Sequence, residues 1–214
     1  MPKSATSVQC VTICLFPAQS EAMRSTRALL VKGAESFLKG KALIEHQPRF
    51  CKASPEALND VLSGDLLFCP DFADEAEAAG MMPEIDQRLR KFRYEDVHVD
   101  GVIDGYREVI FTRAASYPSF AAVEAGTVKV VRELMAAPDM AILPAHVLDL
   151  SAKGSIRPHV DGKHLSGVFV AGLSLLSTRI VRFRHTQNPN ATVDLILPPR
   201  SFYMQRYANC LSFI

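Results

Sequence analysis

The strongest constraint on the fold is a succession of short hydrophobic segments that begins after Pro138. The segments are rich in β-branched and aromatic residues and are separated by Gly, Pro, Asn and Ser, a pattern typical of strands joined by tight turns. NPN at 188–190 predicts a hairpin turn, and Gly154 predicts another turn within KGSIRPH. The expected strands are AILPAHVLDL (141–150), GVFVAGLSLL (167–176), RIVRFRHT (179–186), TVDLILP (192–198) and SFYMQR (201–206).

Helical patterns dominate the part of the chain before these strands. Apolar residues at helical spacing in PSFAAVEAGTVKVVRELMA predict a helix that lies against a sheet. In the earlier helix, Gly80 and Pro83 are expected to cause a break. Helices followed by a run of strands favour an α+β fold, with helices on one face of an antiparallel sheet or sandwich. The expected elements are a strand at 65–72, a helix from there to about Phe92, a strand–turn–strand at 93–113 and a helix at 118–136.

The N-terminal segment differs in composition from the rest. Residues 1–52 carry eight basic and three acidic residues and are rich in Ser, Thr and Ala. The stretch MRSTRALLVKGAESFLKGKALI could form an amphipathic helix with a basic surface, a pattern typical of mitochondrial presequences. A disordered basic tail fits the same composition, and both alternatives stay open. The predicted organisation is a basic leader over 1–60 and a folded domain over 65–214.

Charge and cysteine content exclude several classes of protein. The net charge of +1 lacks the surplus of Lys and Arg with which dedicated nucleic-acid binders neutralise phosphates. An odd number of cysteines without a CxxC pair argues against a disulfide framework or structural zinc. The hydrophobic run VTICLFPA (11–18) is too short to cross a bilayer. Cys69 is expected to be a small core residue. The cysteines are Cys10, Cys14, Cys51, Cys69 and Cys210.

The tetrapeptide HVDG occurs twice, at 98–101 and at 159–162. On a strand, residues i and i+2 share a face, so a His and an Asp at this spacing can both face one metal ion. Such a pair supplies two of the three ligands of a 2-His-1-carboxylate iron site. The first copy lies in the charge-rich stretch YEDVHVDGVIDGY and is interpreted as a surface strand and turn. The second copy lies between two hydrophobic strands, so His159 and Asp161 are the candidate ligands.

The segment around the second copy resembles the catalytic core of AlkB-like dioxygenases, and within them the mitochondrial AlkB homologue seven branch. The block HVLDLSAKGSIRPHVDGKHLSGVFVAGLSLLSTRIVRFRHT (146–186) carries the likeness. It continues through the P-x-S-x-Y-like turn at Pro199, Ser201 and Tyr203, and upstream through YEDVHVDGVIDGYRE to about Leu66. The resemblance therefore covers roughly two-thirds of the chain.

The resemblance implies a double-stranded β-helix (jelly-roll) core flanked by N-terminal helices. It also implies Fe(II) and 2-oxoglutarate as metal and co-substrate, with His159 and Asp161 as iron ligands. Tyr203 would hydrogen-bond the 2-oxoglutarate carboxylate. The branch is associated with the mitochondrial matrix, fatty-acid metabolism and regulated necrotic death. Because it lacks the long lid of base-flipping repair members, the expected substrate is a protein or a mitochondrial RNA.

The chain departs from the family pattern at its C-terminal end. The family has a further ligand histidine and then an arginine that pairs with 2-oxoglutarate, but SFYMQRYANCLSFI ends at Ile214 without either. His164 and His185 are not expected to replace that ligand. The sequence alone therefore predicts missing C-terminal strands, weak iron binding and impaired turnover. The alternative is a non-catalytic jelly-roll interaction or scaffold protein. Arg200 also stands where the family turn usually has Gly, a position that tolerates positive φ.

Two other patterns are interpreted as structural. GAESFLKGKA (33–42) has six residues between its glycines and ends in Ala, so it does not match a phosphate-binding loop. Arg179, Arg182 and Arg184 alternate on one expected strand, and a solvated strand face is favoured over a phosphate-binding stripe.

Overall fold

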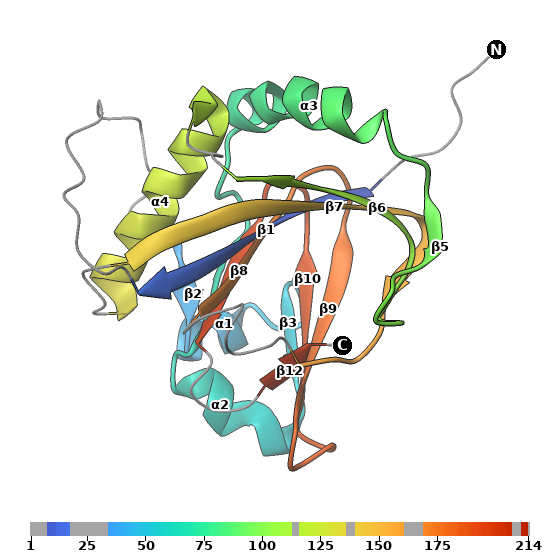
Figure 1. Ribbon diagram of the computed structural model, residues 1–214. Coiled ribbons are helices and arrows are strands. Elements are labelled where there is room, and N and C mark those ends of the chain that lie inside the picture. Colours follow the sequence, from blue (N-terminus) through green and yellow to red (C-terminus); the bar gives the residue numbers. More distant parts are fainter. Residues whose placement is uncertain are drawn as a thin grey trace.

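A computed structural model describes residues 8–17, 34–112, 116–135, 140–160, 169–206 and 211–213 (Figure 1). Its strands are β1 (Val8–Pro17), β2 (Leu38–Lys39), β3 (Cys51–Ala53), β4 (Leu66–Cys69), β5 (Glu95–Val97), β6 (Ile103–Phe111), β7 (Met140–Ile156), β8 (Phe169–Ser174), β9 (Arg179–His185), β10 (Thr192–Leu197), β11 (Phe202–Arg206) and β12 (Leu211–Phe213). Its helices are α1 (Lys41–Glu45), α2 (Leu58–Leu62), α3 (Glu75–Leu89) and α4 (Pro118–Met135), with short 3-10 turns at Ala34–Ser36 and Pro55–Ala57.

The strands form two sheets. The larger has eight strands in the order β2-β4-β11-β8-β1-β7-β6-β5, and the smaller has four in the order β12-β9-β10-β3. The described strand pairs are antiparallel. The N-terminal strand β1 lies between β7 and β8 and pairs with both. It therefore joins the two halves of the larger sheet.

The inner face of the larger sheet packs against the smaller sheet. Phe68, Val170 and Tyr203 of the larger sheet share a buried hydrophobic cluster with Phe183 and Val193 of the smaller one. On β10, which carries Val193, buried and half-buried positions alternate as the period of two in a β-strand requires. The central strands β4 and β8 are buried at every position. The two sheets thus form a sandwich with a common core.

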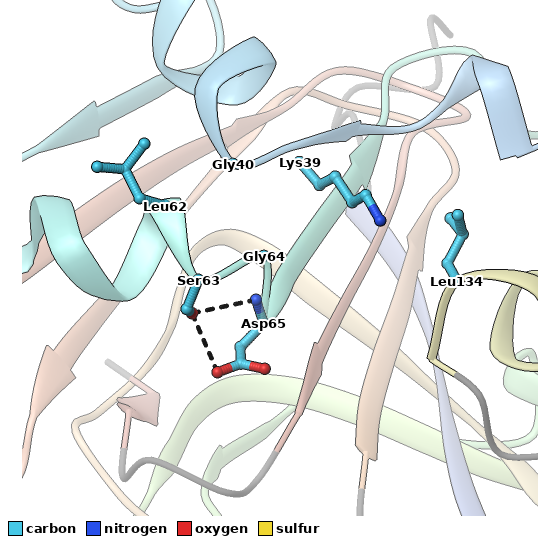
Figure 2. A pocket seen from close by; sticks show the side chains of 7 residues that line it. All are labelled: Lys39, Gly40, Leu62, Ser63, Gly64, Asp65 and Leu134. Atoms are coloured by element: carbon cyan, nitrogen blue, oxygen red, sulfur yellow. Dashed lines mark hydrogen bonds between the residues drawn. The ribbon is translucent and has the colours of Figure 1, made fainter.

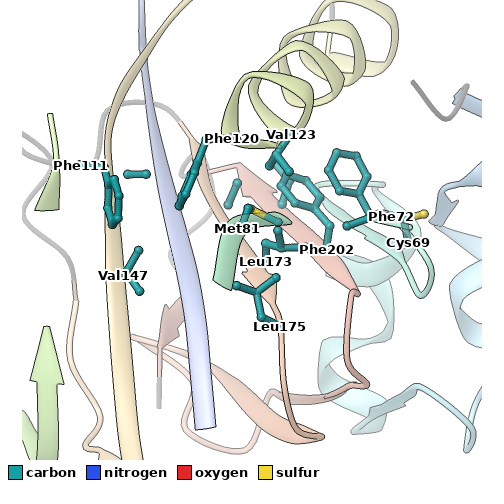
Figure 3. Packing of buried hydrophobic residues seen from close by; sticks show 14 of the residues in the cluster. Cys69, Phe72, Met81, Phe111, Phe120, Val123, Val147, Leu173, Leu175 and Phe202 are labelled. Atoms are coloured by element: carbon teal, nitrogen blue, oxygen red, sulfur yellow. The ribbon is translucent and has the colours of Figure 1, made fainter. Parts of the chain in front are cut away.

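The outer face of the larger sheet is covered by α3 and α4 (Figure 1). Figure 3 shows Met81 of α3 and Phe120 of α4 against Phe111, Leu173 and Phe202 of the sheet. The rings of Phe111 and Phe120 stack with their centroids 4.7 Å apart. The expected α+β class, with helices on one face of a largely antiparallel sheet, is confirmed. No helix among the described residues is both long and apolar enough to cross a membrane.

Helix α3 runs unbroken through the two residues that were expected to interrupt it. Its start is fixed by a capping box, in which Asp74 accepts from the Glu77 N–H and Glu77 accepts from the Asp74 N–H. Pro83 lies inside the helix, and the buried face on either side of it holds the helix against the core. Gly80 allows α3 and α4 to approach each other closely, because a Cβ there would lie 2.3 Å from Ser119 Oγ of α4.

Strand β7 is longer than the sequence predicted, because Gly154 does not open a turn. Gly154 lies within β7 opposite Gly105 of β6, where the register shifts between Asp104 and Tyr106. A Cβ on Gly154 would lie 2.5 Å from the Gly105 carbonyl oxygen. The glycines therefore allow a bulge in a continuing strand pair. Glycine is common both in turns and in β-bulges, so Gly154 alone could not distinguish the two in the sequence.

The structure also places much of residues 1–60 inside the fold. Strand β1 is central in the larger sheet, and Leu43 and Cys51 are buried in the sandwich core. The predicted boundary at residues 60–65 therefore does not divide a folded from an unfolded part among the described residues. Whether the segment is also a mitochondrial presequence stays a prediction. The first half of the amphipathic helix expected from Met23 (23–33) lies outside the described residues. Its second half forms a 3-10 turn (Ala34–Ser36), strand β2 (Leu38–Lys39) and the start of α1 instead of one continuous helix.

Two single-residue expectations are confirmed. Arg200 has a φ of 68°, the conformation that a glycine would adopt without steric cost. Its backbone is held by the Arg200 N–H, which donates to the Ser174 carbonyl, and by its carbonyl, which accepts from Ala73. Cys69 is buried in the core under α3.

Candidate functional site

His159, the candidate metal ligand in the described part of the second HVDG, lies three residues beyond the end of β7. Its Nδ1 is 2.9 Å from the Arg157 carbonyl oxygen. Because a carbonyl can only accept, Nδ1 carries the proton in this hydrogen bond. Metal-ligating histidines commonly have such a backbone partner. The second candidate ligand, Asp161, and the neighbouring His164 lie outside the described residues, so their placement stays a prediction.

Tyr203, the candidate 2-oxoglutarate contact, lies on β11 and points into the sandwich. It is 5% exposed and packs edge-on against Phe183 of β9, with ring centroids 5.9 Å apart. Its ring lies over Gly172 of β8, where a Cβ would be 2.5 Å from Tyr203 Cε1. The absence of a side chain at Gly172 therefore makes room for the tyrosine on the inner face.

One row of cross-strand pairs joins Tyr203 to the other half of the larger sheet. Tyr203 pairs with Gly172, Gly172 with Thr12 of β1, and Thr12 with His146 of β7. Since directly paired residues lie on the same face of a sheet, His146 shares the inner face with Tyr203. The inner face of β6 and β7 is thus a continuation of the face that holds Tyr203.

A polar cluster that the sequence did not reveal lies on this inner face, and we call it the Glu108 cluster (Glu108, His98 and His146). Glu108 Oε2 is 2.5 Å from His146 Nε2, and Glu108 Oε1 is 3.7 Å from His98 Nε2. The His98 ring packs edge-on against Tyr106, with centroids 5.3 Å apart. Burial, followed by the Glu95 carboxylate, raises the pKa of Tyr106 to about 12. The cluster is 28–38% exposed in its side chains, so a ligand could reach it.

A second ionic network lies on the opposite, helix-covered face of the same strands. The fully buried Asp149 accepts from Arg107 Nε at 2.8 Å and from the Tyr94 hydroxyl at 2.9 Å. Burial raises the pKa of Asp149, and the bonds from Arg107 and Tyr94 oppose that rise. Arg107 also donates to the Leu89 carbonyl at the end of α3. This network fastens α3 and the start of β5 to the sheet behind the site.

The remaining sequence candidates have structural surroundings. His185 Nδ1 accepts from the N–H groups of Gln187 and Asn188, so the imidazole caps the NPN turn. Arg182 forms a two-bond ion pair with Asp194 of the adjacent strand β10. That pair neutralises one charge of the arginine stripe and agrees with a solvated strand face. The alternation of Glu108 with core residues along β6 could have indicated a polar position on the inner face. It could not identify His146 of β7 as the partner.

A pocket of about 330 Å³ lies at the end of the segment GAESFLKGKA (33–42) (Figure 2). Lys39 and Gly40 line it on one side, and Ser63 and Asp65 on the other. Figure 2 shows Ser63 Oγ bonded to the Asp65 carboxylate at 3.0 Å and accepting from the Asp65 N–H. The pocket contains none of His159, Tyr203 or the Glu108 cluster. We assign no function to it.

The donor chemistry of His159 fits an iron ion, because an imidazole is a common ligand of iron. Among the described residues, no three His, Cys, Asp or Glu side chains are arranged to hold a metal ion. A complete ligand set would have to include Asp161, which that observation does not cover. On the inner face, the buried Tyr203 lies over Gly172.

The comparisons with known proteins place the chain in a family. It is 35% identical over 156 residues to the mouse protein named alpha-ketoglutarate-dependent dioxygenase alkB homolog 7, mitochondrial, a match that covers 72% of this chain and 68% of the relative. It is 34% identical over 164 residues to the bovine protein of that name, covering 75% and 70%. A scan against protein-family models found no match. At this identity and coverage, the chain belongs to the alkB homolog 7 family of AlkB-like dioxygenases.

Proposed function

We propose that this protein is an Fe(II)- and 2-oxoglutarate-dependent dioxygenase whose two sheets form the jelly-roll core of the family. The observation that carries the proposal is the similarity over most of the chain to relatives named as dioxygenases of this type. In the proposal His159 and Asp161 hold iron, and the Tyr203 hydroxyl donates to a 2-oxoglutarate carboxylate. When bound, iron with 2-oxoglutarate and oxygen supplies the oxidation of an unactivated C–H bond.

The chain's own residues give each partner a defined task. The Arg157 carbonyl fixes the His159 ring so that Nε2 is the coordinating atom. The burial of Tyr203 between the sheets excludes water from the co-substrate carboxylate and strengthens the hydrogen bond to it. The Glu108 cluster lies on the same inner face, where a substrate would approach.

The substrate class and the compartment are also part of the proposal. The relatives are named mitochondrial, and we propose the mitochondrial matrix for this chain. A net charge of +1 gives no general attraction to nucleic acid, so a protein substrate and an RNA substrate both remain within the proposal. A non-catalytic jelly-roll scaffold would be the conclusion if the chain bound neither iron nor 2-oxoglutarate.

The test compares two tyrosines that each lose only a hydroxyl. Calorimetric titration of Mn(II)-loaded protein with 2-oxoglutarate is expected to show binding that Tyr203→Phe weakens by roughly tenfold, because a hydrogen bond to a charged group contributes about 1.5–3 kcal/mol. Tyr106→Phe is the matched control, since Tyr106 is also buried on the inner face but donates to Glu95. Equal affinity in both variants would refute the role of Tyr203. Succinate formation in the same samples with Fe(II) tests the turnover of the chain.

A further inference from the structure

Arg179, the first residue of β9, lies on the face of the smaller sheet that is turned toward the larger sheet. It pairs directly with Leu197 of β10, which is buried in the core between the sheets. Directly paired residues share a face, and so do residues four positions apart on a strand, such as Arg179 and Phe183. Arg182 and Arg184 therefore lie on the opposite, outer face. The three arginines do not form one stripe, and Arg179 needs a separate explanation.

The Arg179 guanidinium reaches across the sandwich to the larger sheet. Its Nη2 lies 3.5 Å from the Ser151 carbonyl oxygen of β7, at the outer limit for a hydrogen bond. Its Nε is buried and, among the described residues, has no hydrogen-bond partner. The inner-face residues just before Ser151 are Leu148 and Leu150, whose side chains offer no acceptor. Protein groups in the described part of the chain therefore satisfy little of the five N–H donors of this guanidinium.

Arg179 differs from other strand arginines in its charge balance. Arg107 of β6 forms an ion pair with Asp149. Arg182 of β9 forms one with Asp194. No ion pair joins Arg179 to a carboxylate of the described residues. A guanidinium stays protonated in proteins, so it cannot avoid the cost of burial by losing its charge. A bound anion would satisfy both the charge and the buried N–H.

We propose that Arg179 binds a carboxylate of a small acid between the two sheets. A guanidinium can donate through Nε and a terminal nitrogen to the two oxygens of one carboxylate, which matches its planar fork. The Arg179 side chain is only half-buried, so a ligand can reach it from solvent. The buried Nε and the missing counter-ion carry this step, and neither depends on the proposed function.

Under the proposed function, the acid is 2-oxoglutarate, and this assignment rests on that function. Arg179 shares the inner face of β9 with Phe183, about 13 Å further along the strand, and Phe183 packs against Tyr203. The two candidate contacts of the co-substrate thus enter the same interior. The same carboxylate chemistry could come from an acidic side chain of a protein substrate, which the experiment distinguishes.

The test observes the guanidinium directly by ¹⁵N NMR. The Nε–H resonance of Arg179 is assigned by its loss in Arg179→Gln. At constant ionic strength, with and without the diamagnetic Zn(II), 2-oxoglutarate is expected to shift this resonance until it saturates. The Nε–H resonance of Arg182, which is bonded to Asp194, is expected to stay unchanged. Nα-acetylglutamate α-amide is the second probe and represents an acidic side chain of a substrate.

Matched variants then measure the contribution to affinity. In calorimetric titrations of Mn(II)-loaded protein with 2-oxoglutarate, Arg179→Gln is expected to weaken binding by roughly tenfold or more, because it removes charge-assisted hydrogen bonds. Arg182→Gln is the control from the outer face of the same strand, with an expected change of less than about twofold. Arg179→Lys, which keeps the charge and loses the fork, is expected to lie between them. Equal melting temperatures of the variants exclude a general loss of structure.

The outcomes separate this inference from the proposed function. If neither probe shifts the Arg179 resonance, Arg179 is not an anion-binding residue and the inference is wrong. If only the acetylglutamate amide shifts it, the carboxylate site is supported and the assignment to 2-oxoglutarate is wrong. If 2-oxoglutarate binding depends on Tyr203 and is equal in Arg179→Gln and Arg182→Gln, the proposed function survives and the inference does not. If the chain binds no metal, the proposed function fails, and the resonance without Zn(II) still decides the role of Arg179.

Discussion

Thr12→Pro is expected to abolish the cooperative folding of the chain, or to lower its free energy of unfolding by about 4 kcal/mol or more. Thr12 lies in the middle of β1 and is paired with His146 on one side and Gly172 on the other. Proline lacks the N–H that a central strand needs and is excluded from such strands. Because β1 joins the two halves of the larger sheet, the loss separates β7 from β8. Urea unfolding followed by circular dichroism measures it.

The control for this prediction is Thr12→Val, which keeps the backbone N–H and the branching at Cβ. It is expected to change the free energy of unfolding by less than about 1 kcal/mol. Similar unfolding midpoints for the proline and valine variants would mean that β1 is not a central strand. The N-terminal segment would then be interpreted as the leader that its composition suggests.

Arg107→Ala is expected to cost about 3–5 kcal/mol of stability, because it leaves a fully buried carboxylate without its cation. Asp149 would keep only the Tyr94 hydroxyl. Burial already raises the pKa of Asp149, and loss of Arg107 raises it further. A raised carboxyl pKa favours the folded state at low pH and disfavours it as pH rises through that value. The deficit of Arg107→Ala is therefore expected to be smaller near pH 5 than near pH 7.

The matched control is Arg182→Ala, which breaks an ion pair of similar geometry on the solvent side of β9. The Arg182 side chain is 54% exposed, and exposed pairs contribute about 0–1 kcal/mol. Guanidinium chloride unfolding of both variants at the two pH values gives the comparison. The buried Asp149 does not govern the stability of the protein if the two variants lose the same free energy of unfolding. The same conclusion follows if the loss in Arg107→Ala grows on acidification.

The strands after Pro138 could be predicted from local pattern, whereas β1 could not. Each C-terminal strand is an apolar segment bounded by turn residues, and β9 and β10, which follow each other along the chain, are also partners in the sheet. The run VQCVTICLFP carried the same strand signal in β1. The residues paired with β1 are at least 123 positions away (Pro17 to Met140), so nothing nearby in the sequence opposed the interpretation of the basic segment as a leader.

The site shows a similar division. The spacing of His159 and the resemblance around Tyr203 could be read from the sequence, because short motifs carry them. The Glu108 cluster depends on the pairing of β6 with β7. This pairing brings Glu108 and His146, which are 38 residues apart in the sequence, within hydrogen-bonding distance. The first HVDG was interpreted correctly as a turn. The hydrogen bond from the Arg157 N–H to the Val102 carbonyl, which joins the residues flanking the two HVDG segments, follows from the pairing of β6 with β7, which the sequence does not specify.

The most direct test of the account is an anaerobic calorimetric titration with Fe(II) of the unaltered chain, His159→Ala and His185→Ala. The His185 ring caps a turn through Nδ1, so its loss serves as a control for removing an imidazole from the same sandwich. The account predicts that the unaltered chain binds about one Fe(II) weakly, that His159→Ala loses this binding and that His185→Ala keeps it. Undiminished binding in His159→Ala would contradict the placement of iron at the second HVDG.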